Sequence, residues 1–119
     1  FITSLVFKKF FKIKYLDINI AKRILDLYKF RLGYNTGDAS EPTLYPNLFE
    51  LLEYLDNRKT IYVEIFTNGS THVKDIKYWN ELSKRMPDNS NLVFTICGTT
   101  QKLHEKYRVG SKLQDILDN

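Results

Sequence analysis

The chain has 119 residues, of which 43% are hydrophobic and 14% aromatic, and this is enough apolar material for one packed globular domain. Its 18 basic and 14 acidic residues give a formal net charge of +4, an excess too small to identify a nucleic-acid-binding protein by itself. The single cysteine, Cys97, excludes an internal disulfide. No apolar run reaches the roughly 18 residues that span a bilayer. We therefore expect one domain over residues 1–119, with no membrane segment and a cytoplasmic location.

The N-terminal part carries two helical patterns. Val6, Phe10 and Ile13 recur at i, i+4 and i+7 in a run where lysines alternate with aromatic residues. Such a basic and aromatic run could contact nucleic acid, but we favour lysines in water and rings against a sheet. Asp17 is a plausible N-cap for the second helix. Six apolar residues are expected on the buried side of that helix: Ile20, Ala21, Ile24, Leu25, Leu27 and Tyr28.

Three short runs rich in β-branched and aromatic residues predict strands at about residues 30–35, 61–67 and 92–97. The segments between and after them have helical periodicity. The apolar residues that define these helices are Leu48, Leu51, Leu52 and Leu55, then Val73, Ile76, Trp79, Leu82 and Met86, and finally Leu103, Tyr107, Leu113, Ile116 and Leu117, with an interruption at Val109–Gly110.

This alternation of helices and strands, joined by short turns, predicts an α/β fold with a parallel sheet. Three strands are too few to close a barrel, so the sheet is either a small open one or part of a larger (β/α) barrel. The chain begins at Phe1 and ends in an unfinished helical pattern. From this we expect a fragment of a longer protein.

The loop at residues 36–46 joins the first predicted strand to the next helix, and it contains the dipeptide Glu41-Pro42. We expect Pro46 to be a first-turn proline of that helix. In parallel sheets, ligands bind beside the loops that follow the carboxyl ends of the strands. Thr67-Asn68-Gly69-Ser70 and Thr95-Ile96-Cys97-Gly98 follow the second and third strands, so the three segments are expected at one edge.

Together with the Tyr-Trp-Asn-Glu-Leu run at 78–82 and His-Glu-Lys-Tyr-Arg-Val-Gly at 104–110, this succession resembles the radical S-adenosylmethionine enzymes from about Asp17 to Asn119. The resemblance implies a partial (β/α) barrel that binds S-adenosylmethionine beside a 4Fe-4S cluster and generates a 5′-deoxyadenosyl radical. It implies an unknown peptide or small-molecule substrate, recognised mainly by the remainder of the barrel.

Site residues are implied only where the motifs match. Ser40, Glu41 and Pro42 align with the family's Gly-Gly-Glu-Pro loop, which holds the methionine ammonium. Thr67 and Asn68 align with a strand-end Thr-Asn-Gly that faces the cofactor. Thr95 aligns with a hydroxyl that can bond the cofactor's polar groups, and Arg108 aligns with an arginine that can pair with its carboxylate. No catalytic residue and no metal ligand is implied within this chain.

The chain also departs from the family pattern. Three cysteines spaced Cys-x3-Cys-x2-Cys hold the family's cluster, and this chain has no such segment. Either the motif lies upstream of Phe1, or, if residues 2–5 align with the segment before it, hydrophobic residues replace the cysteines, namely Val6, Phe10 and Ile13. Ser40 replaces a glycine, and Cys97 replaces an aspartate. We therefore expect this chain alone to be inactive in radical chemistry, while a longer parent would be an enzyme.

Two alternatives stay open, a degenerate non-catalytic module with the same edge and a basic nucleic-acid-binding α/β domain, which is less favoured.

Each candidate site residue also has an ordinary structural interpretation. Glu41 could be a solvated loop charge, Asn68-Gly69 a simple turn, and Arg108 a capping or surface ion-pair residue. Cys97 fits a small buried hydrophobe better than a nucleophile, and the two histidines lack the spacing of zinc ligands.

Overall fold

The computed structural model describes residues 15–27, 33–36, 41–58, 62–88 and 90–119. Three strands form its sheet, β1 (Gly33–Thr36), β2 (Tyr62–Thr67) and β3 (Asn91–Phe94). The helices are α2 (Ile18–Asp26), the 3-10 turn η1 (Pro42–Leu44), α3 (Leu48–Asp56), α4 (Ile76–Arg85), α5 (Gln101–Tyr107) and α6 (Leu113–Leu117).

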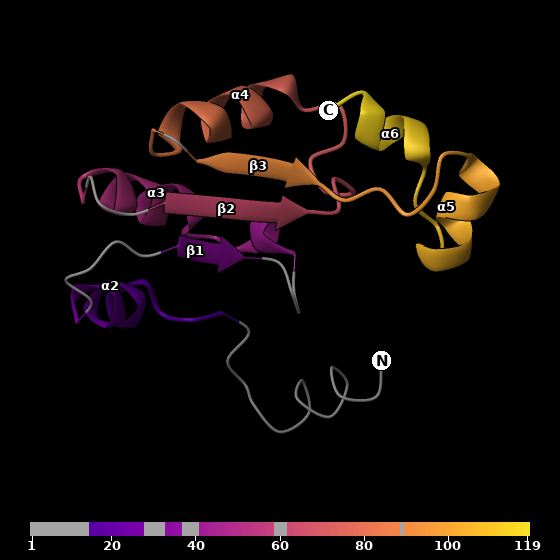
Figure 1. Cartoon of the computed structure of the whole chain (residues 1–119). Helices are drawn as coiled ribbons and strands as arrows, with labels where there is room; N and C mark the ends of the chain where they lie inside the picture. The colour runs from indigo at the N-terminus through magenta and orange to yellow at the C-terminus, as the bar shows by residue number, and fades with distance from the viewer. Residues whose placement is uncertain (1–14, 28–32, 37–40, 59–61, 89) are drawn as a thin grey trace.

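The sheet is parallel throughout, in the order β1-β2-β3 (Figure 1). Gly33 pairs with Tyr62 and Glu64 pairs with Asn91, so the three carboxyl ends face the same side. The prediction of an α/β fold with a parallel sheet is therefore confirmed. The helices α5 and α6 lie beyond the ends of β2 and β3, on the right of Figure 1.

The strand boundaries differ from those predicted, most clearly in β3. That strand ends at Phe94, which pairs with Thr67, so the prediction of a strand to Cys97 is wrong. Because β2 ends at Thr67 and turns away at Gly69, where φ is +65°, the residues after Thr95 have no partner strand to pair with. β1 covers 33–36, the end of the first predicted strand and one residue beyond it.

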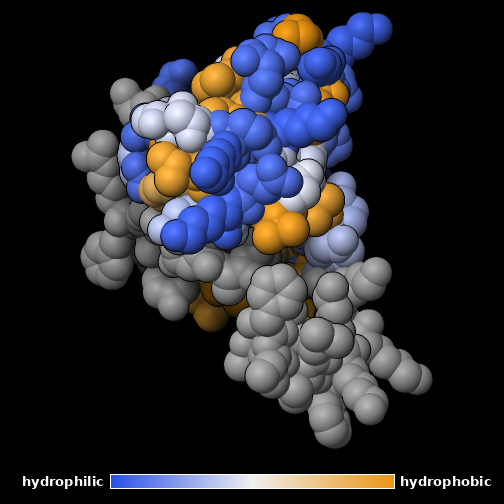
Figure 2. All heavy atoms as spheres, turned by 90° about the vertical axis from the view of Figure 1, so that its right-hand side faces the viewer, coloured by the Kyte–Doolittle hydropathy of each residue, from blue (hydrophilic) through white to orange (hydrophobic). Residues whose placement is uncertain are grey.

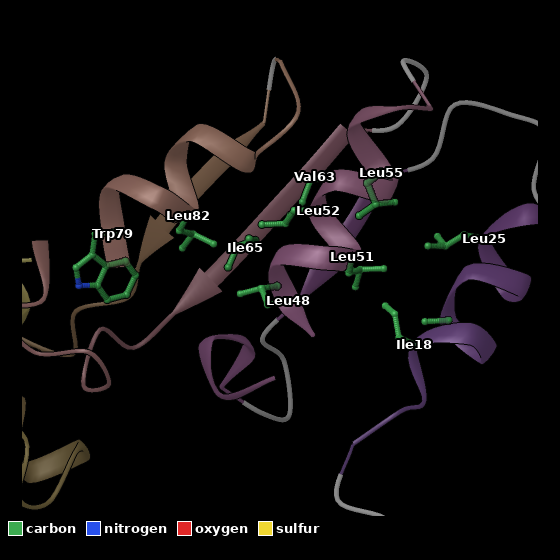
Figure 3. Packing of buried hydrophobic residues seen from close by; sticks show 11 residues of the cluster. Ile18, Leu25, Leu48, Leu51, Leu52, Leu55, Val63, Ile65, Trp79 and Leu82 are labelled. Atoms are coloured by element: carbon green, nitrogen blue, oxygen red, sulfur yellow. The ribbon is translucent and has the colours of Figure 1, made fainter. Parts of the chain in front are cut away.

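The helix α3 lies between the sheet and α2, and it contributes more residues to the core than any other element. Figure 3 shows Leu48 and Leu52 directed towards Ile65 on β2, while Leu51 points towards α2. The four leucines of α3 are at most 4% exposed. Two faces of one short helix are thus buried, which its i, i+3, i+4, i+7 leucine pattern permits.

Only one stripe of α2 is buried, and it consists of Ile18, Ala21 and Leu25. The predicted burial of Ile20, Ile24 and Leu27 is wrong, since these side chains are 49%, 44% and 80% exposed. The reason is that α2 packs on the outer side of α3, which covers a narrow face only. The predicted N-cap is confirmed, because the Asp17 carboxylate accepts from the N–H groups of Asn19 and Ile20.

Two helix starts differ from the sequence prediction. Pro46 precedes the N-cap Asn47, so it does not lie in the first turn of α3, whereas Pro42 begins η1. The helix α4 begins at Ile76 after its N-cap Asp75, and Val73 lies outside it. The backbone just before Asp75 is left-handed, with φ of +57° at Lys74, and this conformation excludes an earlier start.

The break predicted at Val109–Gly110 is confirmed, since α5 ends at Tyr107 and α6 begins at Leu113. Figure 2 looks at this end of the molecule and shows a largely hydrophilic surface with small hydrophobic patches. Exposed apolar side chains here include Leu103, Tyr107, Val109 and Leu117. No helix in the described part of the chain is long and apolar enough to cross a membrane.

Several predicted features lie outside the described residues. They are the helical face of Val6, Phe10 and Ile13, the residue Tyr28, the strand start at 30–32, Ile61 and the loop residue Ser40.

The packing of α3 makes Leu52 a sensitive position. Leu52 is 1% exposed, and a buried Leu→Ala change removes about 2–5 kcal/mol of stability through lost burial and a cavity. We expect Leu52→Ala to lower the free energy of unfolding by that amount in urea titrations. Leu27→Ala, at a side chain that is 80% exposed, is the matched control, and equal losses in the two variants would contradict this packing.

Candidate functional site

The first element of the candidate site is the carboxylate of Glu41, at the N-cap of η1. Its Oε1 accepts from Thr43 twice, from the backbone N–H at 3.2 Å and from the hydroxyl at 2.7 Å. An acidic N-cap followed by proline at the first helical position is a favourable start for a turn. The local sequence Glu-Pro-Thr therefore holds its own carboxylate in place.

The same carboxylate reaches across to the end of β2. Thr67 donates its hydroxyl to Glu41 Oε1 at 2.7 Å, and the N–H of Asn68 donates to Oε2 at 2.9 Å. Thr67 is 1% exposed. Glu41 thus ties the loop after β1 to the carboxyl end of β2.

Thr95 continues this network to the third strand. Its N–H and its hydroxyl both donate to the carbonyl oxygen of Thr67, at 2.8 and 3.1 Å. The Thr95 hydroxyl in turn accepts from the Arg108 guanidinium at 2.6 Å. Hydrogen bonds therefore run without a gap from Glu41 through Thr67 and Thr95 to Arg108, which the end of α5 supplies.

The two ends of this network carry opposite charges that do not pair. Within the described residues, neither Glu41 nor Arg108 forms a salt bridge. Among the described residues, Oε2 of Glu41 accepts one hydrogen bond, from Asn68, and Arg108 donates to Thr95 and, at 2.9 Å, to the Cys97 sulfur. A carboxylate oxygen accepts more than one hydrogen bond and a guanidinium has five N–H groups. Both ends therefore keep hydrogen-bonding capacity for a ligand.

The structure brings together five of the seven predicted site residues directly, namely Glu41, Thr67, Asn68, Thr95 and Arg108. Pro42 is buried beside them as the first residue of η1, and Ser40 lies outside the described residues. Asn68-Gly69 forms the expected turn, in which the Asn68 side-chain oxygen accepts from the Ser70 N–H at 2.8 Å. Asn68 contributes to the candidate site with its backbone N–H, which donates to Glu41.

Residues that the sequence did not single out complete the surroundings. The Thr43 carbonyl accepts from His72 Nε2 and from the Tyr78 hydroxyl, both at 3.3 Å. The rings of His72 and Tyr78 stack with their centroids 3.5 Å apart, and Thr71 bonds the Thr43 hydroxyl. The contacts of Thr43 join residues 28 to 35 positions apart, so the local sequence Glu-Pro-Thr could not indicate them.

A shallow pocket of about 310 Å³ lies beside this network. Its lining includes Tyr45, Phe49, His72 and Tyr78, so it presents mostly aromatic surface. It adjoins the site through Thr43, which lines the pocket and bonds Glu41.

The burial of His104 was not predicted, because its sequence context indicates only that it lacks metal-ligand spacing. It is fully buried on α5, where Nε2 lies 3.1 Å from the Ser111 hydroxyl. Its Nδ1 has no hydrogen-bond partner among the described residues. His104 therefore belongs to the packing of α5 against the segment before α6.

The described residues include no group of three or more histidine, cysteine or acidic side chains that could hold a metal ion. Cys97 is only half-buried and accepts from Arg108, so the prediction of a buried small hydrophobe is wrong. A 4Fe-4S cluster held by three thiolates does not fit the residues of this chain, which has one cysteine. By contrast, Glu41 keeps acceptor capacity for a cationic group, and Arg108 keeps donor capacity for an anionic group.

No family model matches the chain, and neither a curated protein nor a solved structure was found to match it.

The environment of Tyr78 predicts a pH dependence of stability. Burial, followed by the charges of Glu41 and Asp75, raises the pKa of Tyr78 from 10.0 to about 12. Between these values the unfolded chain has lost this proton while the folded chain retains it, so stability present below pH 10 is lost as the pH rises. We expect the free energy of unfolding to fall over this range, and to fall less in Tyr78→Phe.

Urea titrations at several alkaline pH values measure this effect. Tyr107→Phe, which removes a phenol that is 69% exposed, is the matched control. An unchanged pH dependence in Tyr78→Phe would show that Tyr78 keeps its ordinary pKa in the folded protein.

Proposed function

We propose that this edge binds the amino-acid end of S-adenosylmethionine, and that the chain is the central part of a (β/α) barrel of the radical S-adenosylmethionine type. One observation carries the proposal: the unpaired charges of Glu41 and Arg108, joined through Thr67 and Thr95 at the carboxyl ends of parallel strands. This is the side of a parallel sheet on which ligands bind.

The methionine part of the ligand carries one ammonium and one carboxylate, which match the two ends of the network. Glu41 accepts from the ammonium through Oε2, which has only the Asn68 N–H as a protein donor. Arg108 donates to the carboxylate with the N–H groups that Thr95 and Cys97 do not use. Charge-assisted hydrogen bonds of this kind are about twice as strong as neutral ones.

Threonine hydroxyls keep the two charges apart and orient them. The Thr67 hydroxyl donates a hydrogen bond to Glu41, and the Thr95 hydroxyl donates one to the Thr67 carbonyl. Neither hydroxyl therefore needs to rotate when a ligand binds. Fixed donors and acceptors reduce the ordering that binding would otherwise require. A site of this kind is suited to a zwitterionic ligand.

The proposal for this chain concerns binding and orientation. In the radical S-adenosylmethionine enzymes a 4Fe-4S cluster supplies the electron that cleaves the cofactor, and the single cysteine here does not provide the ligands for it. The residues Val6, Phe10 and Ile13 at the aligned positions favour a second candidate function. In this second candidate the chain is a non-catalytic module that binds S-adenosylmethionine without a cluster.

The first test removes one charge of the site and keeps its shape. Glu41→Gln weakens the bond to the ligand ammonium, and a hydrogen bond to a charged group is worth roughly 1.5–3 kcal/mol. We expect the affinity for S-adenosylmethionine, measured by calorimetry, to fall about tenfold or more. Glu105→Gln changes the net charge equally at an exposed position on α5 and should bind like the wild type.

Ligand analogues separate a direct contact from a disturbed fold, since Glu41 also holds Thr43 and Thr67. Arg108→Gln should weaken binding of S-adenosylmethionine but leave the affinity for its decarboxylated analogue unchanged. Glu41→Gln should likewise leave unchanged the affinity for an analogue without the amino group. If both variants lose all ligands equally, the assigned contacts are wrong.

A separate measurement tests the absence of a cluster site. After anaerobic reconstitution with iron and sulfide, we expect the purified chain to hold no stoichiometric 4Fe-4S cluster. The chain has one cysteine, whereas three thiolates are required. Iron and sulfide assays with visible spectroscopy provide the readout, and Cys97→Ser identifies any cluster bridged between chains. A stoichiometric cluster that survives Cys97→Ser would contradict this expectation.

A further inference from the structure

The turn that contains Asn68 and Gly69 is held from outside by the residue that follows α6. The side-chain NH2 of Asn119 donates to the Gly69 carbonyl at 2.8 Å, and its oxygen accepts from the Lys74 N–H at 2.8 Å. One amide side chain therefore bridges the beginning and the end of segment 69–74. It does so from a position 45 to 50 residues further along the chain.

Three successive backbone groups of this turn each have a hydrogen-bond partner. The Asn68 N–H donates to Glu41 and the Gly69 N–H donates to the Thr67 hydroxyl, at 2.9 and 3.0 Å. On the opposite side of the turn, the Gly69 carbonyl has Asn119 as its donor. The site bonds and the Asn119 bond thus hold successive groups of the same short turn.

Packing around Gly69 reinforces this arrangement. Gly69 has φ of +65°, and a Cβ at this position would lie 2.9 Å from Ile116 of α6 and 3.0 Å from Phe94 of β3. Ile116 and Asn119 are three residues apart, so the end of α6 contacts the turn with an apolar and a polar group together. The left-handed backbone at His72 and Lys74 lies within the segment that Asn119 closes.

We infer that Asn119 is a positioning residue for the Glu41 site. By holding the Gly69 carbonyl, it fixes the peptide plane between Gly69 and Ser70, which limits rotation at Gly69 and so keeps the Asn68 N–H, two peptide planes earlier, aimed at Glu41 Oε2. The part of this inference that concerns ligand affinity rests on the proposed function, whereas the part that concerns the turn does not. Asn119 itself makes no bond to Glu41, Thr95 or Arg108 among its hydrogen bonds.

Amide hydrogen exchange followed by NMR tests the turn without a ligand. In Asn119→Ala, we expect the exchange rates of the Asn68 and Gly69 amides to rise about fivefold or more, the factor that corresponds to one lost hydrogen bond. The amides of Val63 and Ile65, inside β2, should keep their rates. A merely structural role would raise the rates at all these positions together.

Asn119→Asp separates the two bonds of Asn119. A carboxylate can still accept from the Lys74 N–H but cannot donate to the Gly69 carbonyl, so the inference expects faster exchange in this variant as well. Asp118→Asn is the matched control, because it changes the charge by one at the neighbouring residue, whose carboxylate lies 3.9 Å from Lys74 Nζ. This control should leave the Asn68 and Gly69 amides unchanged.

Titration with S-adenosylmethionine is the second test of this inference. We expect both Asn119 variants to bind it severalfold more weakly than Asp118→Asn and the wild type. Faster exchange with no binding by the wild type would retain the role of Asn119 in the turn and reject the proposed function. Unchanged exchange of the Asn68 and Gly69 amides in Asn119→Ala would overturn the inference, whatever the affinities are.

Discussion

The bridge made by the Glu41 carboxylate is the interaction on which the site depends. Each of its oxygens bonds the end of β2, while Oε1 also holds the turn that begins α3. Without this bridge, the loop after β1 would lose its direct hydrogen bonds to the end of β2. A half-buried carboxylate is stable here because four protein donors replace the water it loses.

The core explains why this bridge can form at a constant geometry. The helix α3 begins only four residues after the last residue of the 3-10 turn, and its leucines bury it against β2 on one side and α2 on the other. Because η1 is joined to so firmly packed a helix, the position of Glu41 relative to β2 follows from the packing of Leu48 and Leu52. Stability and site geometry are therefore linked through one helix.

Local chemistry accounts for what could be predicted from the sequence. Alternating apolar residues identified β2, a capping aspartate identified the start of α2, and Asn68-Gly69 identified a turn. Glu41, Thr67, Asn68 and Thr95 were expected at one edge because the carboxyl ends of parallel strands meet there, whereas the role of Arg108 was implied by the family resemblance alone. The exposed side of α2 and the early end of β3 could not be predicted, since each depends on which neighbour covers a residue. The same holds for His72, Tyr78 and Asn119, whose roles arise from contacts between residues far apart in the chain.

The arrangement of charge is the argument for the proposed binding edge over a purely structural role of these residues. A staple would place Glu41 against Arg108 directly, since a close pair satisfies both groups at once. Instead, two threonines lie between them, and each charged group retains capacity that no described residue uses. Keeping an arginine half-buried without a carboxylate partner is unfavourable for folding alone. In the proposed function, a ligand that carries both charges compensates both groups, and this is the physical reason for proposing a zwitterionic ligand there.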